Sequence, residues 1–363
     1  MAKRYKHLYE QIVTFENLWQ AYRKARKGKR QKQGVSAFEF DLENELLSIQ
    51  EALLKERYEF SGYHTFTIYE PAQRQISAAP FRDRVVHHAI CNVIEPLLDK
   101  AMIYDSYACR IGKGMHRALD RAQWFLRRNS WVLKMDIKKY FFTIDHAILL
   151  HDLSQKFNDP RLLRLLKNLL NTYHSGDEYY FSFSGDLPLD RYRPRGLPIG
   201  NLTSQLFANY FLTPLDRFIK ENLRVKPYLR YMDDLLIFAN DKAELFSYKD
   251  EIESFLSRKR LKIHPKKTQV FPSKNSVRFL GFHLYNGYRK ILRENLTRFT
   301  IKFKKRALDY TNQTIAFDNL LLSLNAWLGF ANKDLHKAVI NRLLSEIKIR
   351  HPDKTYVFTF YLP

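Results

Sequence analysis

Two adjacent aspartates interrupt an otherwise apolar stretch over residues 229–238. Asp233 and Asp234 lie in the middle of this stretch, between residues typical of buried strands. An isolated Asp-Asp pair usually marks a turn, but carboxylates inside a buried strand region carry a large desolvation cost unless something binds them. Asp136 closes another short apolar strand, residues 132–137, 97 positions before Asp233. Three strands that meet at one end of a sheet would bring the three carboxylates together.

Carboxylates grouped in this way suit phosphoryl transfer assisted by two divalent ions. Such ions activate the attacking hydroxyl and neutralise the leaving phosphate in an in-line displacement. Mg²⁺ prefers oxygen ligands and keeps several waters, so two or three carboxylates are enough to hold it. The sequence therefore predicts a site for two Mg²⁺ ions, which Mn²⁺ can replace.

Apolar periodicity predicts the elements that must position these carboxylates. Residues 36–57 and 81–98 show helical spacing, and residues 64–70 alternate as a strand does. Residues 279–284 form another strand-like segment. From residue 290 the pattern is helical again, with an apolar stripe that includes Leu292, Leu296, Phe299 and Phe303, followed by a second helix from Phe317 to Leu328.

The charge balance points to a polyanionic partner. Lys and Arg number 61 against 38 Asp and Glu, which gives a net charge of +23. The densest basic run is residues 23–30, for which a solvated helix end and contact with a nucleic-acid backbone are both open interpretations. Cys91 and Cys109 have no metal-binding or disulfide spacing. We expect a cytoplasmic protein in a bacterial, phage or archaeal host, without a signal peptide or membrane span.

Five motifs occur in a fixed order around the carboxylates. They are Lys134 to Phe141, Gly196 to Gly200 with Ser204-Gln205, Tyr231 to Asp234, Leu261 to Thr268, and Phe279 to Gly281. Over nearly the whole chain the sequence resembles a reverse transcriptase. The resemblance implies an α+β right-hand polymerase with fingers, a palm of antiparallel sheet plus helices, and a helical thumb. The expected bounds are 1–130 for the N-terminal extension and fingers, 131–285 for the palm with a return of the fingers near 150–200, and 286–363 for the thumb.

The resemblance also implies roles around the metal ions. Asp136 and Asp233 would bind metal directly, with Asp234 close by and the backbone carbonyl of Ile137 as a further ligand. Lys267 would protonate the leaving pyrophosphate, although an ordinary surface lysine is an equal interpretation.

Other positions fall where the family binds the incoming dNTP. Phe141 would be a steric gate against a ribose 2′-hydroxyl, or else a core aromatic. Arg74 would hold the triphosphate, because a guanidinium fits a phosphate fork. Arg82 and Arg84 are further candidates, although one of them could pair with Asp83 instead. The usual upstream lysine is not evident in residues 69–72. The remaining predicted contacts to the nucleotide are Ile199, Gly200 and Gln205.

Contacts to the template–primer duplex are expected from the C-terminal part. The family places a primer grip at Phe279, Leu280 and Gly281. The predicted helix after residue 290 presents four cations for phosphate binding without sequence readout, namely Arg298, Lys302, Lys305 and Arg306.

One departure from the family pattern indicates a branch. Ile199 stands where many reverse transcriptases have Gln. Residues 199–205, the stretches 8–12 and 19–23, and residues 107–110 resemble the reverse transcriptases of diversity-generating retroelements. That branch implies an RNA template, a DNA or cDNA primer, misincorporation opposite template adenines, a small basic helical-bundle accessory protein and a structured RNA.

Three alternatives stay open on the sequence. An antiphage or group II-like bacterial reverse transcriptase would carry the same catalytic motifs. An RNA-dependent RNA polymerase shares the palm, although Phe141 and Tyr231-Met232 argue against it. An RNA-binding protein with an inactive palm is disfavoured by the intact aspartates. Because 82 residues follow Gly281, we expect a helical thumb there, without an RNase H domain or both the DNA-binding and endonuclease parts of a full group II intron protein.

Overall fold

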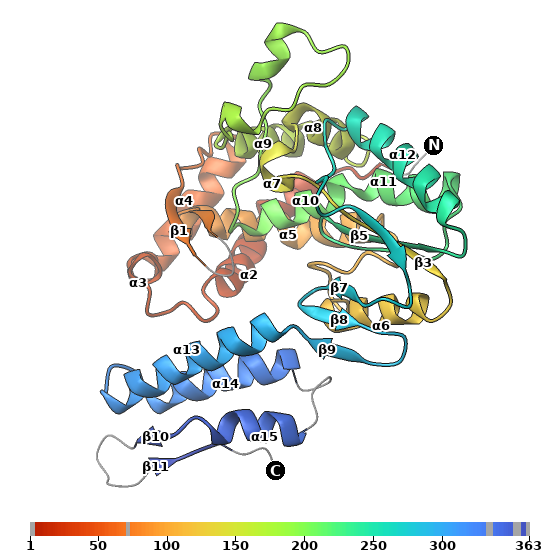
Figure 1. The fold of residues 1–363 in the computed structure, drawn as a ribbon. Helices are drawn as coiled ribbons and strands as arrows, with labels where there is room; N and C mark the ends of the chain where they lie inside the picture. Colours follow the sequence, from red (N-terminus) through yellow and green to blue (C-terminus); the bar gives the residue numbers. More distant parts are fainter. Residues whose placement is uncertain (1–3, 70–72, 332–336, 351–356, 361–363) are drawn as a thin grey trace. The chain divides into compact units, whose positions relative to one another are not determined.

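The chain forms two compact units in a computed structural model that describes residues 4–69, 73–331, 337–350 and 357–360. The first unit consists of residues 1–118 and 132–270, and the second of residues 119–131 and 271–363. Helices and antiparallel sheets occur in both units (Figure 1), which confirms the predicted α+β class.

A four-stranded sheet carries the carboxylates. Its order is β4-β5-β3-β6, formed by β4 (Tyr228–Tyr231), β5 (Asp234–Ala239), β3 (Trp131–Asp136) and β6 (Gln269–Pro272). Leu235 to Phe238 of β5 are all buried, because helices such as α12 (Lys242–Arg258) cover the sheet. A strand buried on both faces has a continuous apolar sequence rather than an alternating one. The predicted strand, bend and strand over residues 229–238 are therefore confirmed.

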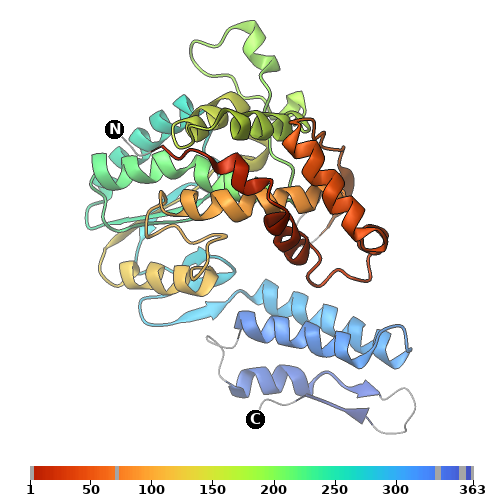
Figure 2. The same ribbon diagram turned by 180° about the vertical axis from the view of Figure 1, so that it is seen from behind.

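A long helix forms the centre of the first unit's helical part. α5 (Phe81–Asp99) buries Val85, Val86, Ala89, Ile90 and Ile94. It packs against α1 (Leu8–Ile12), α2 (Phe15–Ala25) and α10 (Leu202–Phe211), and Figure 2 shows the red N-terminal helices beside the orange α5. The prediction of a helix over residues 81–98 is confirmed.

The single helix expected over residues 36–57 is wrong. The segment forms two helices, α3 (Gln33–Phe40) and α4 (Leu42–Leu54), with a break at Asp41. Asp41 has φ −127° and ψ 46°, which lie outside the helical region and separate the two helices. Phe38 is buried against Phe81, whereas Phe40 is 95% exposed.

A two-stranded hairpin precedes α5. β1 (His64–Ile68) pairs with β2 (Arg74–Ala78) in antiparallel register, with Ile68 opposite Arg74. The strand predicted over residues 64–70 is confirmed as far as Ile68. Residues 70–72, where the family's upstream lysine was sought, lie outside the described residues.

The other elements of the first unit complete its helical layers. α6 (Met115–Leu126) begins in the first unit and ends in the second. The rest are α7 (Tyr140–Thr143), α8 (His146–Ser154), α9 (Pro160–Asn171), the 3₁₀ helices η1 (Asp177–Tyr179) and η2 (Pro188–Tyr192), α11 (Thr213–Arg217) and the π-helix η3 (Phe218–Asn222).

The second unit combines short strands with two long helices. Its elements are β7 (Val277–Phe279), β8 (Phe282–Leu284), β9 (Arg289–Ile291), α13 (Arg293–Thr311), α14 (Phe317–Ala331), α15 (Lys337–Ser345), β10 (Ile349–Arg350) and β11 (Val357–Phe358). The Phe299 ring of α13 stacks on Trp327 of α14 at 3.9 Å, so the predicted apolar stripes do form the helix interface.

The strand-like segment at residues 279–284 proves to be a hairpin. Leu280 and Gly281 form the turn between β7 and β8, and Gly281 has a φ of +86°. A Cβ atom on Gly281 would lie 2.7 Å from the Asn295 amide nitrogen of α13. Glycine is therefore required both by the left-handed backbone and by the close approach of the helix.

Across the residues that the structure describes, no helix combines the length and the apolar character needed to cross a membrane.

Candidate active site

The paired aspartates lie at a two-residue hairpin loop. Tyr231 and Asp234 are opposite each other in the register of β4 and β5, so Met232 and Asp233 form the loop. Met232 has a φ of +56°, which is uncommon for a residue other than glycine and is characteristic of constrained functional turns. The Ile137 N–H donates to the Asp233 carbonyl at 3.3 Å, which joins the end of β3 to this loop. The structure thus brings Asp136 beside the Asp233 loop.

The three carboxylates are close enough to affect one another. Burial, Asp234 and Asp136 together raise the pKa of Asp233 to about 7. Burial and Asp136 also raise the pKa of Asp234, while Lys134 and Lys267 oppose that shift. Partly uncompensated negative charge of this kind is what a divalent cation neutralises.

Lys267 forms an ion pair with one of these carboxylates. Its Nζ atom lies 3.0 and 3.2 Å from the two carboxylate oxygens of Asp136. The backbone of Asp136 is held as well, because its carbonyl accepts the His264 N–H at 2.7 Å. The segment that carries Lys267 is therefore fixed to the end of β3.

A cavity of about 860 Å³ opens in front of these groups, a volume typical of small-molecule sites. Seven of the predicted site residues line it, namely Asp136, Asp233, Ile137, Lys267, Arg74, Phe141 and Ile199. The prediction missed several others, among them Thr67, Gln75, Lys138, Lys139, Tyr179 and His264. Asp234, Arg82, Arg84, Gly200 and Gln205 are not among the described residues that line it.

The loop at residues 199–201 holds the hairpin that carries Arg74. The Ser77 N–H of β2 donates to the Ile199 carbonyl at 2.9 Å. The Asn201 amide donates to the Ser77 carbonyl at 2.8 Å and accepts the Ala79 N–H at 3.2 Å. Gly200 has a φ of +119°, and a Cβ atom there would lie 2.9 Å from the Ile76 side chain.

The family model described as reverse transcriptase (RNA-dependent DNA polymerase) matches residues 70–284, which is more than half of the chain. The chain belongs to the reverse transcriptase family.

Two curated proteins illustrate how distant its relatives are. Protein YkfC of Escherichia coli K12 is 24% identical over 249 residues, which cover 58% of this chain and 63% of YkfC. The group II intron-encoded protein LtrA of Lactococcus lactis is 20% identical over 300 residues, covering 65% of this chain and 47% of LtrA. The chain thus spans less than two thirds of the length of these relatives.

Among solved structures, apo telomerase from Candida tropicalis has a TM-score of 0.48 and 12% sequence identity to this chain. The similarity covers 80% of this chain and 62% of the telomerase chain.

For the polymerase function proposed below, Gly200→Ala is expected to weaken nucleotide binding. The added methyl group must displace Ile76, and with it the β2 strand that carries Arg74 into the cavity. A displacement of about 1 Å near a reaction centre can cost up to ~10²-fold in rate. We expect the KM for dNTP in primer extension to rise about tenfold or more. Gly34→Ala, with open space around its Cβ position, is the control, and equal KM values for both variants would contradict the role of Gly200.

Arg82 and Arg84 bind protein groups. The Arg82 guanidinium pairs with Glu45 and donates to the Ser48 hydroxyl. The Arg84 Nε atom donates to the Ala79 carbonyl at 2.7 Å. Neither arginine pairs with Asp83, whose carboxylate accepts hydrogen bonds from the Tyr58 hydroxyl and the Ser61 N–H.

The two neighbouring aromatic residues of α7, Tyr140 and Phe141, have different surroundings. Phe141 lines the cavity, and its role as a steric gate stays a prediction. Tyr140 also touches the cavity, but it is buried and its hydroxyl donates to the Ala208 carbonyl at 2.5 Å. Gln205 is exposed, with its Oε1 atom 3.6 Å from the Cys109 thiol.

The predicted duplex contacts all lie in the second unit. Arg298 is half-buried and donates to the Asn295 side chain at 3.2 Å, and Arg306 is exposed and donates to the Asn319 carbonyl at 3.2 Å. Lys302 and Lys305 are exposed on the same helix, α13. Phe279 is buried, and the Gly281 carbonyl accepts the Leu292 N–H at 3.0 Å.

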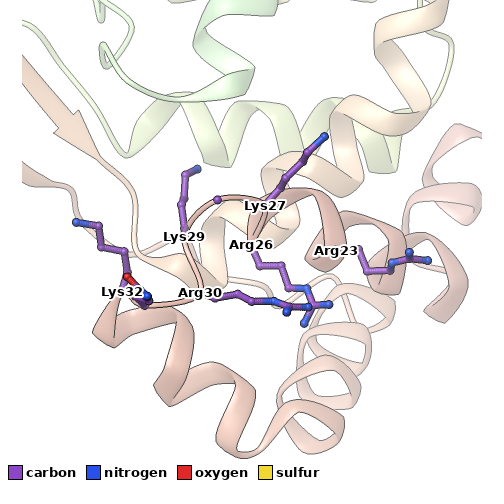
Figure 3. Close-up of a pocket in the computed structure, with 8 residues that line it drawn as sticks. Arg23, Arg26, Lys27, Lys29, Arg30 and Lys32 are labelled. Carbon is purple, nitrogen blue, oxygen red and sulfur yellow. The ribbon is translucent and has the colours of Figure 1, made fainter. Parts of the chain in front are cut away.

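A basic loop joins α2 to α3 and encloses a second cavity, of about 540 Å³. Figure 3 shows the cationic side chains around it, which are Arg23, Arg26, Lys27, Lys29, Arg30 and Lys32. Arg26 pairs with Glu39 at 3.1 Å. Burial and the nearby Arg84 lower the pKa of Lys29, which indicates positive charge that the protein compensates only in part.

A buried charged cluster beneath the aspartate loop was not predicted from the sequence. Arg230 of β4 is fully buried and forms a bidentate ion pair with Asp216, with N–O distances of 2.7 and 2.8 Å. It also donates to the Met232 carbonyl at 3.0 Å and to Asn209. An arginine in an apolar run was the only sequence signal that could have indicated it.

Proposed function

We propose that the protein is an RNA-directed DNA polymerase that extends a DNA or cDNA primer with dNTPs on an RNA template. The observation that carries this proposal is the convergence of Asp136, Asp233, Arg74 and Phe141 on one cavity, in a chain of the reverse transcriptase family. Extension of a primer on an RNA template with dNTPs and Mg²⁺ or Mn²⁺ tests it. No extension with either metal ion would contradict it.

The carboxylates fit a pair of Mg²⁺ ions. The raised pKa values of Asp233 and Asp234 indicate an excess of negative charge where the cations would bind. Within the described residues, no three acidic, histidine or cysteine side chains form a ready-made metal cage. That suits Mg²⁺, which takes one or two carboxylates and completes its shell with water and substrate phosphates. Bound Mg²⁺ would lower the pKa of the primer 3′-hydroxyl and neutralise charge on the pyrophosphate.

The chain's own residues would orient the nucleotide and exclude the wrong sugar. Arg74 would bind the triphosphate through its guanidinium fork. Phe141 would occupy the space that a ribose 2′-hydroxyl needs. Lys267, next to Asp136, is placed to give a proton to the leaving pyrophosphate.

The right-hand architecture is part of the proposal. The first unit would supply fingers and palm, and α13 and α14 would form the thumb. The cations of α13 and of the basic loop would bind nucleic-acid phosphates without reading sequence.

We further propose that the cDNA carries errors opposite template adenines, as in diversity-generating retroelements. Ile199 supports this, since it lines the cavity with an apolar side chain where a Gln could hydrogen-bond the nucleotide. Discrimination that lacks such a contact rests on shape alone and is weaker. A small basic accessory protein and a structured RNA would complete the system.

Ile199→Gln is expected to lower the error frequency opposite template adenine. One new hydrogen bond contributes about 0.5–1.5 kcal/mol, which corresponds to ~2- to 10-fold in error frequency. Sequencing the cDNA measures this, with Ile199→Leu as the apolar control and errors opposite the other three bases as an internal reference. An unchanged error frequency opposite template adenine in Ile199→Gln would contradict the proposed link between Ile199 and adenine-directed errors.

A second candidate is a group II-like or antiphage reverse transcriptase that makes an accurate cDNA. The similarity to the group II intron-encoded protein LtrA favours it. An even, low error frequency across all template bases in the wild-type cDNA would support this candidate and contradict adenine-directed mutagenesis.

A further inference from the structure

A short segment rich in aromatic residues lies beside the active-site cavity. Residues 179–183 have the sequence Tyr-Tyr-Phe-Ser-Phe, and Tyr180 has extended backbone angles, φ −73° and ψ 134°. Tyr179 ends the 3₁₀ helix η1, and the lysines near their rings group Tyr179, Phe181 and Phe183. Tyr180 has a different partner, since its hydroxyl donates to Asp186 at 2.7 Å.

Each of the three rings has a cation over it. Lys139 lies 5.8 Å from the Tyr179 ring, and Lys138 lies 4.8 Å from the Phe181 ring. Lys262 lies between two rings, 5.8 Å from Phe181 and 5.2 Å from Phe183. These are cation–π distances, although such contacts add only modest stability where the rings are partly exposed.

The three lysines retain their positive charge for another partner. In the described part of the chain, no carboxylate forms an ion pair with Lys138, Lys139 or Lys262. The fourth cation near these rings, Arg260, is different, because it pairs with Asp186 at 2.6 Å. The rings themselves are half-buried, so their faces are not fully covered.

The segment connects two cavities of the first unit. Tyr179, Lys138 and Lys139 line the active-site cavity. Phe183, Lys138 and Lys262 line a neighbouring cavity of about 600 Å³. The Tyr179 ring also stacks on the Phe142 ring, with 4.4 Å between the ring centroids.

We propose that Tyr179, Phe181 and Phe183, together with Lys138, Lys139 and Lys262, bind a single-stranded nucleic acid that leads to or from the active-site cavity. We call these six residues the aromatic strip. Aromatic faces stack on unpaired bases of any sequence, and lysines beside them bind the backbone phosphates. The proposal rests on the polymerase function above and adds a binding site to it.

The spacing of the strip suits unpaired bases rather than a duplex. Side chains two residues apart in an extended chain are about 6.6 Å apart. That is about twice the 3.4 Å rise per nucleotide of a stacked strand, so successive rings would meet every second base, with Lys262 near both rings placed to bind a phosphate. In a duplex the base faces are already covered by stacking, so rings of this kind have no surface to contact.

Equilibrium binding of the full-length protein tests the strip. We would measure fluorescence anisotropy of labelled U12 RNA, dT12 DNA and a matched duplex, in EDTA and without dNTPs. Phe181→Leu/Phe183→Leu keeps apolar volume and removes both ring faces. We expect its Kd for the single strands to rise about tenfold or more, while its Kd for the duplex stays nearly unchanged because the substitution removes no positive charge.

Two further variants separate stacking from folding. Phe181→Tyr/Phe183→Tyr keeps the ring faces and should bind single strands as the wild type does. Phe246→Leu removes another exposed ring with a lysine, Lys242, 5.7 Å away, and should leave binding unchanged. Loss of single-strand binding in the Tyr variant as well would show a structural effect and would overturn the proposal.

A comparison of U12 RNA with dT12 DNA identifies which kind of single strand binds the aromatic strip. Weakened binding of U12 alone supports an RNA template on the strip, and equal weakening of U12 and dT12 supports a site for either strand. Unchanged single-strand binding, an equal loss for the duplex, or no single-strand binding by the wild type overturns the strip. Because binding in EDTA needs no catalysis, failure of the strip is distinct from failure of the polymerase function.

Discussion

Asp233→Asn will reduce nucleotide incorporation by at least about 10³-fold. Stabilisation of transition-state charge by bound metal ions contributes several kcal/mol, and each 1.36 kcal/mol is tenfold in rate. Asp233 is the carboxylate at the centre of the constellation, since both Asp234 and Asp136 raise its pKa. The amide keeps the size of the side chain and removes its negative charge. The lower incorporation rate would therefore reflect weaker cation binding.

The measurement is the single-nucleotide incorporation rate on a primed RNA template, at saturating dNTP and several Mg²⁺ concentrations. Asp250→Asn is the matched control, because the Asp250 side chain is 76% exposed on α12 and its change should leave the rate within twofold or so. The melting temperature of Asp233→Asn should be no lower than that of the wild type, because burial and the neighbouring carboxylates disfavour a negative charge at this position. A variant that retains a tenth of the wild-type rate would exclude Asp233 as a metal ligand.

Asp216→Asn will strongly destabilise the first unit. Asp216 and Arg230 are both fully buried, and the substitution leaves the guanidinium charge without its carboxylate. Removing one partner of a buried pair costs about 3–5 kcal/mol. For a unit of this size that corresponds to a fall in melting temperature on the order of 10 °C. Incorporation should fall too, because Arg230 also donates to the Met232 carbonyl of the aspartate loop.

Burial distinguishes the Asp216–Arg230 ion pair from other ion pairs with a similar N–O distance. Glu51 and Lys55 are 2.5 Å apart, yet their side chains are 66% and 58% exposed. Glu51→Gln should therefore cost about 0–1 kcal/mol. Replacing both buried partners, in Asp216→Leu/Arg230→Met, should recover much of the stability lost in Asp216→Asn. Equal melting temperatures for Asp216→Asn and Glu51→Gln would show that the buried pair contributes no more than a surface pair.

Much of the site could be predicted from sequence because its signals are local. The apolar flanks of Asp233 and Asp234 determine two strands and a turn, whatever lies around them. Asp136 ends its strand for the same reason. Helical periodicity over α5 and over α13 depends only on neighbours three and four residues away. The family motifs predicted the order of these elements along the chain and a role for each matched residue.

Only the tertiary structure decided which of the candidate groups meet. β3 lies next to β5 in the sheet although 97 residues separate Asp136 from Asp233, and no local pattern specifies that pairing. Arg74 and Arg82 are equally good phosphate ligands as residue types. The structure turns Arg74 into the cavity and pairs Arg82 with Glu45, since a cation's partner depends on which distant carboxylate the packing brings near it.

The same reason explains what the sequence did not indicate. The break at Asp41 is a local change of backbone conformation that apolar periodicity does not detect. The burial of Arg230 depends on Asp216, from a helix 14 residues earlier. The aromatic strip requires lysines from residues 138–139 and 262 to meet rings at 179–183. Local sequence determined the elements and their chemistry, whereas long-range packing determined the charge partners, because electrostatic and stacking energies depend on separation in space rather than along the chain.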